Sequence, residues 1–259
     1  MNRKGVRPVM HGAVCVWQRD MIVLRRNWFS EIATVMSFPL TFYITFGFGL
    51  RGYIQDINGV PYIFFVVPGL ISMTAILAAF DDGAWGMWFH RIVQKTIEEY
   101  RVNPITVTEI IIGKIISGFT SGFLKGFVVG GFLLLLTGFR FQFAFLLIYL
   151  LFIFLGCIVF SCLGSLCGTL IDKPENLGRM EAVVIMPVIF LAGLFFPLSA
   201  YPAAVLPYIR ALPTTALFDG ARIALLRGQI EGSYLAPLVL CALLAFFAAV
   251  WVFEYKMRG

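Results

Sequence analysis

Six apolar stretches, four of about the length needed to cross a lipid bilayer and two that are longer, occur in this chain of 259 residues. They run over residues 31–51, 62–82, 108–137, 142–171, 181–198 and 235–254. A membrane-spanning helix needs about 20 mostly apolar residues, because each residue advances it by about 1.5 Å through a hydrocarbon core of about 30 Å. We therefore predict an all-α polytopic membrane protein with six transmembrane helices in a single domain, residues 1–259.

Composition leaves no room for a separate soluble module, since 60% of the residues are hydrophobic and only 13% are charged. Three of the five cysteines, Cys157, Cys162 and Cys167, lie five residues apart inside one apolar stretch. That spacing spreads them around a helix, so we expect neither a disulfide nor a metal site. The only histidines are His11 and His90, and Asp81-Asp82-Gly83 lacks the further aspartates of a metal-dependent phosphotransfer site. A membrane-embedded enzyme is disfavoured.

Lysine and arginine mark one side of the membrane. They concentrate before residue 31, between residues 82 and 108, between residues 171 and 181, and after residue 254. Because cytoplasmic loops carry the excess of positive charge, we predict that both termini are cytoplasmic. The basic residues are divided among separate loops and form no continuous basic face, so we expect no nucleic-acid partner.

Two segments differ from simple spans. Residues 13–30 alternate Trp17, Met21, Leu24 and Trp28 with charged residues, which predicts an amphipathic interface helix. It serves either as an anchor in the lipid headgroups or also as a contact for a cytoplasmic partner. Residues 199–228 follow the fifth apolar stretch and carry repeated prolines, which favours short re-entrant helices on the outer side, before the last span.

A charged amphipathic helix is predicted at residues 88–101, directly after the span FFVVPGLISMTAILAAF. Arg91, Lys95 and Glu98 or Glu99 are neighbours at three- and four-residue spacing, while Ile92, Val93 and Ile97 form an apolar strip. Asn103-Pro104 ends this helix, because a proline disfavours helical geometry in the residue before it. A solvated charged loop is the alternative. A second short polar loop, Asp172–Met180, is a weaker candidate contact.

The third apolar stretch, residues 108–137, combines a glycine strip with a buried charge. Gly118, Gly122, Gly126 and Gly130 recur every four residues, which lets another helix approach closely, within the same chain or from another copy. Lys125 lies inside the same stretch and shares a helix face with Lys114. Since a charge in the bilayer is costly, we expect Lys125 to face a dimer interior, to pair with an acidic group, or to reach toward the outer interface.

Three passages together resemble the membrane subunits of the ABC-2 family of ATP-binding-cassette exporters. They are FVVPGLISMT at residues 65–74, IEEYRVNPITVTEIIIGK at 97–114 and FLAGLFFPLSAYPAAVLPYIRALPTTALFDGAR at 190–222. Within that family the chain is similar to the bacterial branch of nodulation-factor, daunorubicin-type and polysaccharide exporters. The resemblance covers essentially the whole chain and implies a permease of the bacterial inner membrane.

The resemblance also implies partners and roles. It implies a homodimer of this subunit, surrounded by membrane lipid, with two copies of a separate ABC ATP-binding subunit. The helix at residues 88–101 then acts as the coupling helix that the ATPase grips. The residues expected at this ATPase-coupling contact are His90, Arg91, Lys95, Glu98, Glu99, Arg101, Asn103, Pro104, Asp172 and Lys173.

ATP and Mg²⁺ are expected on the partner ATPase subunit, because this chain has no GxxxxGK phosphate loop followed by Ser or Thr. Phe38, Phe42, Tyr43 and Phe46 fall near one face of the first span, and the resemblance implies that the first and fifth spans meet at the dimer seam. These residues and Lys125 are the substrate-path candidates. A lipid-linked glycan, a lipid or a hydrophobic drug all fit, and the alternative function is an ATP-independent channel or scaffold.

Overall fold

The structure is a computed structural model that describes residues 11–46, 56–57, 59–95, 105–138 and 142–258. Within these ranges the chain is helical, and the only β-type pairing is an isolated bridge between Ile57 and Val60. Four helices are long and apolar enough to cross a membrane. They are α2 (Tyr62–Trp88, continued by a π-helical turn to Val93), α4 (Val107–Thr137), α5 (Phe143–Leu170) and α10 (Gly232–Arg258). An all-α membrane protein is thus confirmed, while the number of six spans stays a prediction.

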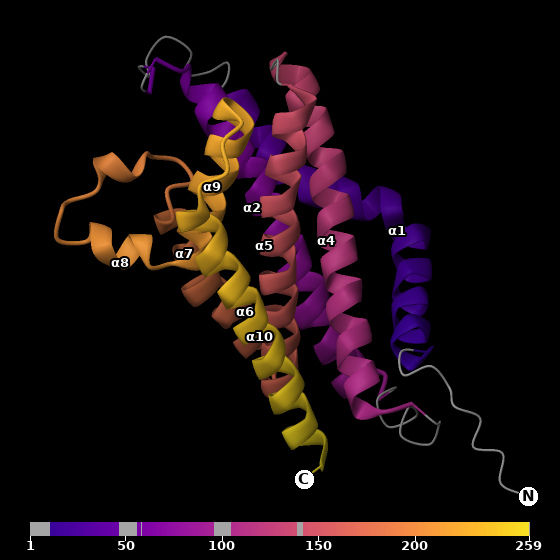
Figure 1. The fold of residues 1–259 in the computed structure, drawn as a ribbon. Coiled ribbons are helices and arrows are strands. Elements are labelled where there is room, and N and C mark those ends of the chain that lie inside the picture. The colour runs from indigo at the N-terminus through magenta and orange to yellow at the C-terminus, as the bar shows by residue number, and fades with distance from the viewer. Residues whose placement is uncertain (1–10, 47–55, 58, 96–104, 139–141, 259) are drawn as a thin grey trace, which may run out of the picture.

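Helix α2 is the centre of the bundle. In Figure 1, α2, α4 and α5 run side by side along the molecule, and α2 packs closely on both of the others. In the most apolar 18-residue stretch of α2, 83% of the residues are buried. The corresponding share for α10, which lies on the outside, is 22%. This burial explains why that part of α2 is apolar around its whole circumference, since a helix that is buried on every side has no polar face.

Glycines allow the central helices to touch. A Cβ atom built on Gly122 of α4 would lie 2.6 Å from the carbonyl oxygen of Ala75 in α2, too close for two such atoms. On α5, Gly164 meets the backbone of α2 around Phe80 and Ala84 in the same way. The predicted glycine strips therefore pack helices together within one chain.

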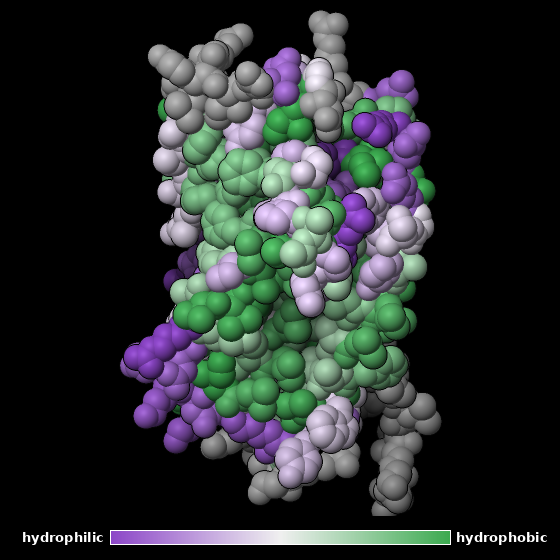
Figure 2. Space-filling model, turned by 90° about the vertical axis from the view of Figure 1, so that its left-hand side faces the viewer, coloured by the Kyte–Doolittle hydropathy of each residue, from purple (hydrophilic) through white to green (hydrophobic). Residues whose placement is uncertain are grey.

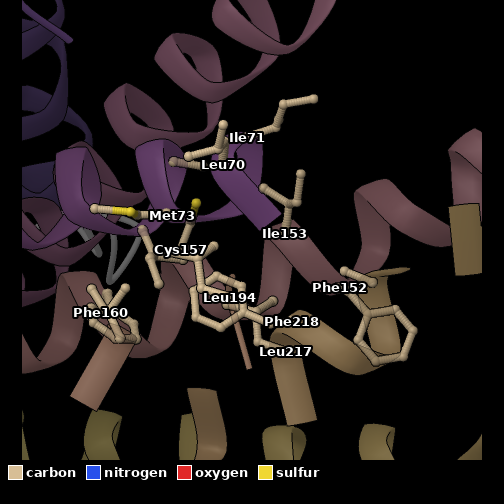
Figure 3. Close-up of a cluster of buried hydrophobic side chains, with 14 of the residues drawn as sticks. Leu70, Ile71, Met73, Phe152, Ile153, Cys157, Phe160, Leu194, Leu217 and Phe218 are labelled. Carbon is tan, nitrogen blue, oxygen red and sulfur yellow. The ribbon is translucent and has the colours of Figure 1, made fainter. Parts of the chain in front are cut away.

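The core lies where α2, α5 and α9 (Pro213–Arg227) converge. Figure 3 shows Leu70 and Met73 of α2 on the side of Cys157 and Phe160 of α5, with further side chains from α9 and from the segment before it, while the Ile71 side chain lies against Gly130 of α4. The remaining labelled members of this cluster are Phe152, Ile153, Leu194, Leu217 and Phe218. Cys157 is packed as a small apolar side chain, and the five cysteines form no disulfide.

Helix α1 (His11–Ile44) departs from the sequence prediction. The interface helix expected at residues 13–30 and the span expected at 31–51 form one unbroken helix as far as it is described, because no glycine or proline separates them around residue 30. Its first half runs along α4, with Ala13 and Val16 against Gly113. Only five residues of α1 are buried, so the helix lies at the edge of the bundle.

The fifth predicted span, residues 181–198, also differs. The helical segment begins earlier, as α6 (Pro174–Met180), continues through a π-helical turn (Glu181–Ile185) and ends with α7 (Met186–Leu191). Gly193 adopts a left-handed conformation with φ of 80°, which ends the helix well before residue 198. Short elements follow, including α8 (Leu206–Arg210) and then α9, in place of one long helix. Short helices at residues 199–228 agree with the prediction, and their position relative to the membrane stays a prediction.

The outer surface suits a lipid environment. Hydrophobic side chains cover much of the face drawn in Figure 2, while strongly hydrophilic residues gather toward its lower left margin and its upper right. Large exposed apolar residues include Leu135, Phe143, Phe247 and Trp251 on the long helices. Helix α1 begins and α10 ends at the same end of the molecule (Figure 1). This arrangement is the one expected if both termini lie on one side of the membrane.

Candidate functional site: a charged seam and a loop junction

Five charged residues form a seam between α1, α2 and α4, which we call the charged seam: Asp20, Glu31, Asp82, Lys114 and Lys125. Lys125 Nζ lies 2.9 Å from Glu31 Oε2 of α1 and 2.8 Å from Asp82 Oδ2 of α2. Nearer the start of α4, Lys114 Nζ lies 2.7 Å from Asp20 Oδ2. Both lysine side chains are only 3% exposed. The seam therefore holds α1 to the bundle through paired charges.

The spacing of charges in the sequence is a signal for this seam that the prediction for Lys125 did not use. Asp20 and Glu31 are eleven residues apart in α1, and Lys114 and Lys125 are eleven residues apart in α4. Eleven residues complete about three helical turns, so each pair lies on one face of its helix. Two helices with the same spacing of opposite charges can pair twice along their length, and α1 and α4 do so.

Neighbouring polar contacts extend the charged seam toward the beginning of α1. Arg19 lies 2.8 Å from Asp20 Oδ1, and its guanidinium is within 3.0 Å of the His90 ring. Burial of Asp20 opposes its ionisation, but Lys114 and Arg19 more than offset that effect and lower the carboxyl pKa below its usual value. Trp17 donates a hydrogen bond to the Thr120 hydroxyl of α4 at 3.2 Å.

The loop junction is a second cluster, formed by Trp88, Arg91, Asp172 and Lys256. Arg91 Nη1 lies 2.6 Å from Asp172 Oδ1, and the same guanidinium donates to the Ile171 and Gly168 carbonyls at the end of α5. Trp88 Nε1 donates to the Asp172 carbonyl at 2.8 Å, and Lys256 of α10 lies 3.2 Å from Asp172 Oδ1. Hydrogen bonds from Arg91 and Lys256 lower the pKa of the exposed Asp172 carboxyl. The junction thus joins the end of α2 to α5 and α10.

Of the ten expected ATPase-coupling residues, the structure describes five. Arg91 is turned toward the end of α5 and His90 toward Arg19, whereas Lys95, Asp172 and Lys173 are exposed. The other five fall outside the described residues: Glu98, Glu99, Arg101, Asn103 and Pro104. The start of the helix predicted at 88–101 continues α2 as a π-helical turn, Phe89–Val93, and Lys95 has a positive φ of 52°. The described part of this segment is therefore not a separate helix.

The substrate-path candidates are placed as follows. Lys125 pairs with acidic groups, one of the three expectations. Tyr43 is buried and donates to the Leu136 carbonyl at 3.0 Å, which gives it a packing role. Phe42 stacks on Phe46 and on Phe195, which follows α7, while Phe38 is about half exposed. The first and fifth predicted spans therefore meet at Phe42 and Phe195 within one copy, and the dimer seam stays a prediction.

Arg222 of α9 is a deeply buried cation at the other end of the bundle. Its guanidinium pairs with Asp219 at 2.7 Å and donates to the backbone carbonyls of Phe65, Gly193 and Leu194. It also lies over the Phe65 ring, 3.8 Å from the centroid. These contacts attach the turn at Gly193, which follows the end of α7, to α2. Arg222 was not among the site residues predicted from the sequence.

Replacing Lys125 by Met tests the charged seam. The variant leaves Glu31 and Asp82 without their cation, and since both carboxylates are partly exposed we expect a loss of about 2 kcal/mol, less than for a fully buried pair. Adding Asp82→Asn should recover part of the loss. The measurement is the thermal unfolding midpoint of the purified protein in detergent.

The matched control is Lys256→Met, whose partner Asp172 is exposed and for which we expect a change below about 1 kcal/mol. Equal destabilisation by the two lysine variants would show that the charged seam contributes no more than a surface ion pair.

Comparison with known proteins agrees with this architecture. A family model described as ABC-2 type transporter matches residues 13–226. Nodulation protein J of Bradyrhizobium diazoefficiens is 23% identical over 244 residues, which cover 93% of this chain and 92% of that protein. The inner membrane transport permease YadH of Escherichia coli (strain K12) is 26% identical over 255 residues, 94% of each chain. Nodulation protein J of Rhizobium meliloti is 25% identical over 246 residues, 94% of this chain and 93% of that protein.

The family match includes α1, the central helices and most of α9, and so contains the charged seam, Arg91 and Asp172 of the loop junction, and Arg222. Long apolar helices around a largely buried α2 are what a membrane-embedded transport subunit requires. The chain belongs to the ABC-2 type transporter family, whose members form the membrane-spanning permease component of ABC transporters.

Proposed function

We propose that this chain is the permease subunit of an ATP-driven exporter in the bacterial inner membrane. Two copies assemble with two copies of a separate ATPase, and an amphipathic, lipid-linked or hydrophobic substrate moves outward across the membrane. The relative YadH is named as an inner membrane transport permease, which supports the transport role. The loop junction is the observation that carries the proposed coupling to ATP.

The loop junction supports coupling because it links the segment after α2 to two other long helices. Arg91 lies in the π-helical turn, just before the segment expected to contact the ATPase. Its guanidinium covers the last carbonyls of α5, where a cation is favoured by the partial negative charge of a helix end. Movement of the segment after Lys95 would therefore pull on α5 directly and on α10 through Asp172 and Lys256.

Nucleotide would act by stabilising one arrangement of the ATPase dimer, and the junction would pass that preference to the helices. The exposed side chains Lys95, Asp172 and Lys173 are available to the partner surface. Arg91, which is 12% exposed, instead transmits the movement within this chain. We therefore assign contact and transmission to different residues of the expected set.

Replacing Arg91 by Ala should separate ATP hydrolysis from transport. The ATPase should still associate, because the Arg91 side chain faces α5. We expect transport and substrate-stimulated hydrolysis to fall at least tenfold, since the lost charge-assisted hydrogen bonds are worth about 1.5–3 kcal/mol. Both activities are measured on the complex co-expressed with its ATPase and reconstituted in nanodiscs and vesicles.

Arg210→Ala, which removes an exposed arginine from α8, is the control and should leave both activities unchanged. Glu98→Ala and Glu99→Ala, in the expected contact segment, should instead weaken ATPase association. If no ATPase associates with the wild-type chain, the exporter proposal fails and an ATP-independent channel or scaffold becomes the better description. If Arg91→Ala behaves like Arg210→Ala, the junction does not transmit the movement.

A further inference from the structure

A polar cavity of about 140 Å³ lies beside the charged seam, between α1, α2 and α4. It falls in the half of α4 that begins at Val107, the end at which α1 also begins. At about 30 Å³ per molecule, this volume holds about four or five waters or one small polar group. Its polar lining consists of Asp20, Asn27, Glu31, Asp82, His90, Lys114, Ser117 and Ser121.

The buried hydroxyl of Ser121, unpartnered within the described residues, indicates that the cavity binds a ligand. The residue is 97% buried, because only 3% of its surface is exposed, yet its hydroxyl has no hydrogen-bond partner within the described chain. The preceding residue, Thr120, donates to the carbonyl of Ile116, four residues earlier in the same helix. Ser121 does not make the equivalent hydrogen bond within the described chain. A buried hydroxyl without a partner is costly, and Ser121 is one of the residues that line the cavity.

The charges around the cavity select the kind of ligand. Asp20, Glu31 and Asp82 are balanced by three cations, Lys114, Lys125 and Arg19. A charged ligand, whether an anion or a cation, would therefore add an unbalanced charge to this cluster. Glu31 and Asp82 each use one carboxylate oxygen for Lys125, which leaves the second oxygen of each to accept a hydrogen bond. Such a lining favours an uncharged group that donates several hydrogen bonds.

Apolar residues at the edge of the cavity indicate that its ligand also has an apolar part. Val23 and Leu24 of α1 border the cavity, and Val23 is about half exposed. An occupant that reaches the polar lining across this edge places its own apolar part against α1 and the surrounding lipid. The combination of a polar interior and an apolar border fits an amphipathic molecule entering from the membrane.

We propose that this cavity binds the uncharged, hydroxyl-bearing head group of an amphipathic molecule. Ser121 and the second oxygens of Glu31 and Asp82 are the groups that bind its hydroxyls. This inference rests on the proposed function, because the bound molecule is either the exported substrate or a lipid on the substrate's path. The hydroxyl group would satisfy Ser121 without breaking any ion pair of the charged seam.

The test compares three lipids that share two oleoyl chains and differ in the head group. They are glucosyl dioleoylglycerol, which is uncharged and hydroxyl-rich, dioleoyl phosphatidic acid, which is anionic, and dioleoyl trimethylammonium propane, which is cationic. Each is added to the wild-type chain, in complex with its ATPase, in phosphatidylcholine nanodiscs. Retained lipid is counted by native mass spectrometry, and ATP hydrolysis is measured in the same preparation.

The wild-type chain should retain the glucosyl lipid in preference to the two charged lipids. Ser121→Ala should weaken that retention about fivefold, the effect of one lost hydrogen bond. The matched control is Ser165→Ala, which removes another buried hydroxyl that has no partner within the described residues but does not line the cavity. Ser165→Ala should retain the glucosyl lipid like the wild type.

Three results would overturn the inference: equal retention of the glucosyl lipid by the Ser121 and Ser165 variants, preferential retention of a charged lipid by the wild type, or no preference of the wild type among the three lipids. A cavity filled only by water would give the first of these. A complex that hydrolyses ATP but shows no preference for the glucosyl lipid would reject the binding site and leave the exporter proposal standing. Loss of ATPase association in the wild type would count against the exporter proposal instead.

Discussion

Replacement of Arg222 by Ala should destabilise this protein by about 3–5 kcal/mol, more than the loss of Lys125 from the charged seam. The substitution leaves the largely buried Asp219 without its cation and removes the donor from three backbone carbonyls at once. Those carbonyls belong to α2 and to the turn around Gly193. Without these hydrogen bonds, the segment between α7 and α9 loses its attachment to the central helix. The yield and the thermal unfolding midpoint of the purified protein measure the effect.

A second variant separates the charge effect from the loss of the carbonyl contacts. Arg222→Ala combined with Asp219→Asn should be more stable than Arg222→Ala alone, because no uncompensated carboxylate is left buried. The control is Arg227→Ala in the last turn of the same helix, where the side chain is exposed and the expected change is small. A midpoint for Arg222→Ala equal to that of Arg227→Ala would mean that the buried contacts contribute nothing to stability.

The second large effect is expected from Gly122→Ala. The added Cβ would lie 2.5–2.6 Å from atoms of Ala75 and Ala79, two of which belong to the backbone and cannot rotate away. Helices α4 and α2 must then move apart along their contact, at a cost of about 1–3 kcal/mol. The thermal unfolding midpoint in detergent reports the stability, and the ATPase activity of the complex reports whether α4 still lies where coupling needs it.

Gly131→Ala is a matched control in the same helix, because no atom lies within 4 Å of a Cβ built at that position. Alanine favours helical geometry over glycine, so this variant should be neutral or slightly more stable. If both glycine variants behaved alike, the close approach of α4 to α2 would not be a determinant of stability.

The sequence could predict the long apolar helices because each contains its own signal. The apolar runs that form α2, α4, α5 and α10 are long enough and hydrophobic enough to be recognised without any neighbour. Thr106 and Glu109 also form a reciprocal cap at the start of α4, a pattern visible in the sequence. Local signals are sufficient for these four elements.

Elements that depend on neighbours are harder to predict. The charges of α1 suggest a helix lying in the interface, but two of them, Asp20 and Glu31, pair with lysines almost one hundred residues later in the chain. The end of α7 depends on Gly193, whose left-handed conformation is held by Arg222 contacts from α9. Neither feature can be derived from a local window of sequence.

The candidate site shows the same division. The charge of Lys125 marks it as functional or paired, yet its partners become visible only once α1 and α2 are placed beside α4. Arg91 is predicted on the coupling helix, and its contact with the end of α5 becomes visible only in the structure, because the π-helical turn continues α2 beyond Trp88. Ser121 carries no distinguishing sequence signal, since serines are common in membrane helices and its significance comes from a missing partner.

The charged seam also sets an order of events during synthesis. Glu31 and Asp82 leave the ribosome well before Lys125, so the acidic side of the seam exists for a time without its basic side. Until α4 has been made, these two carboxylates lack the cation with which they pair in the folded chain. The contact of α1 with the bundle through the charged seam can therefore form only after α4 is in place beside α2.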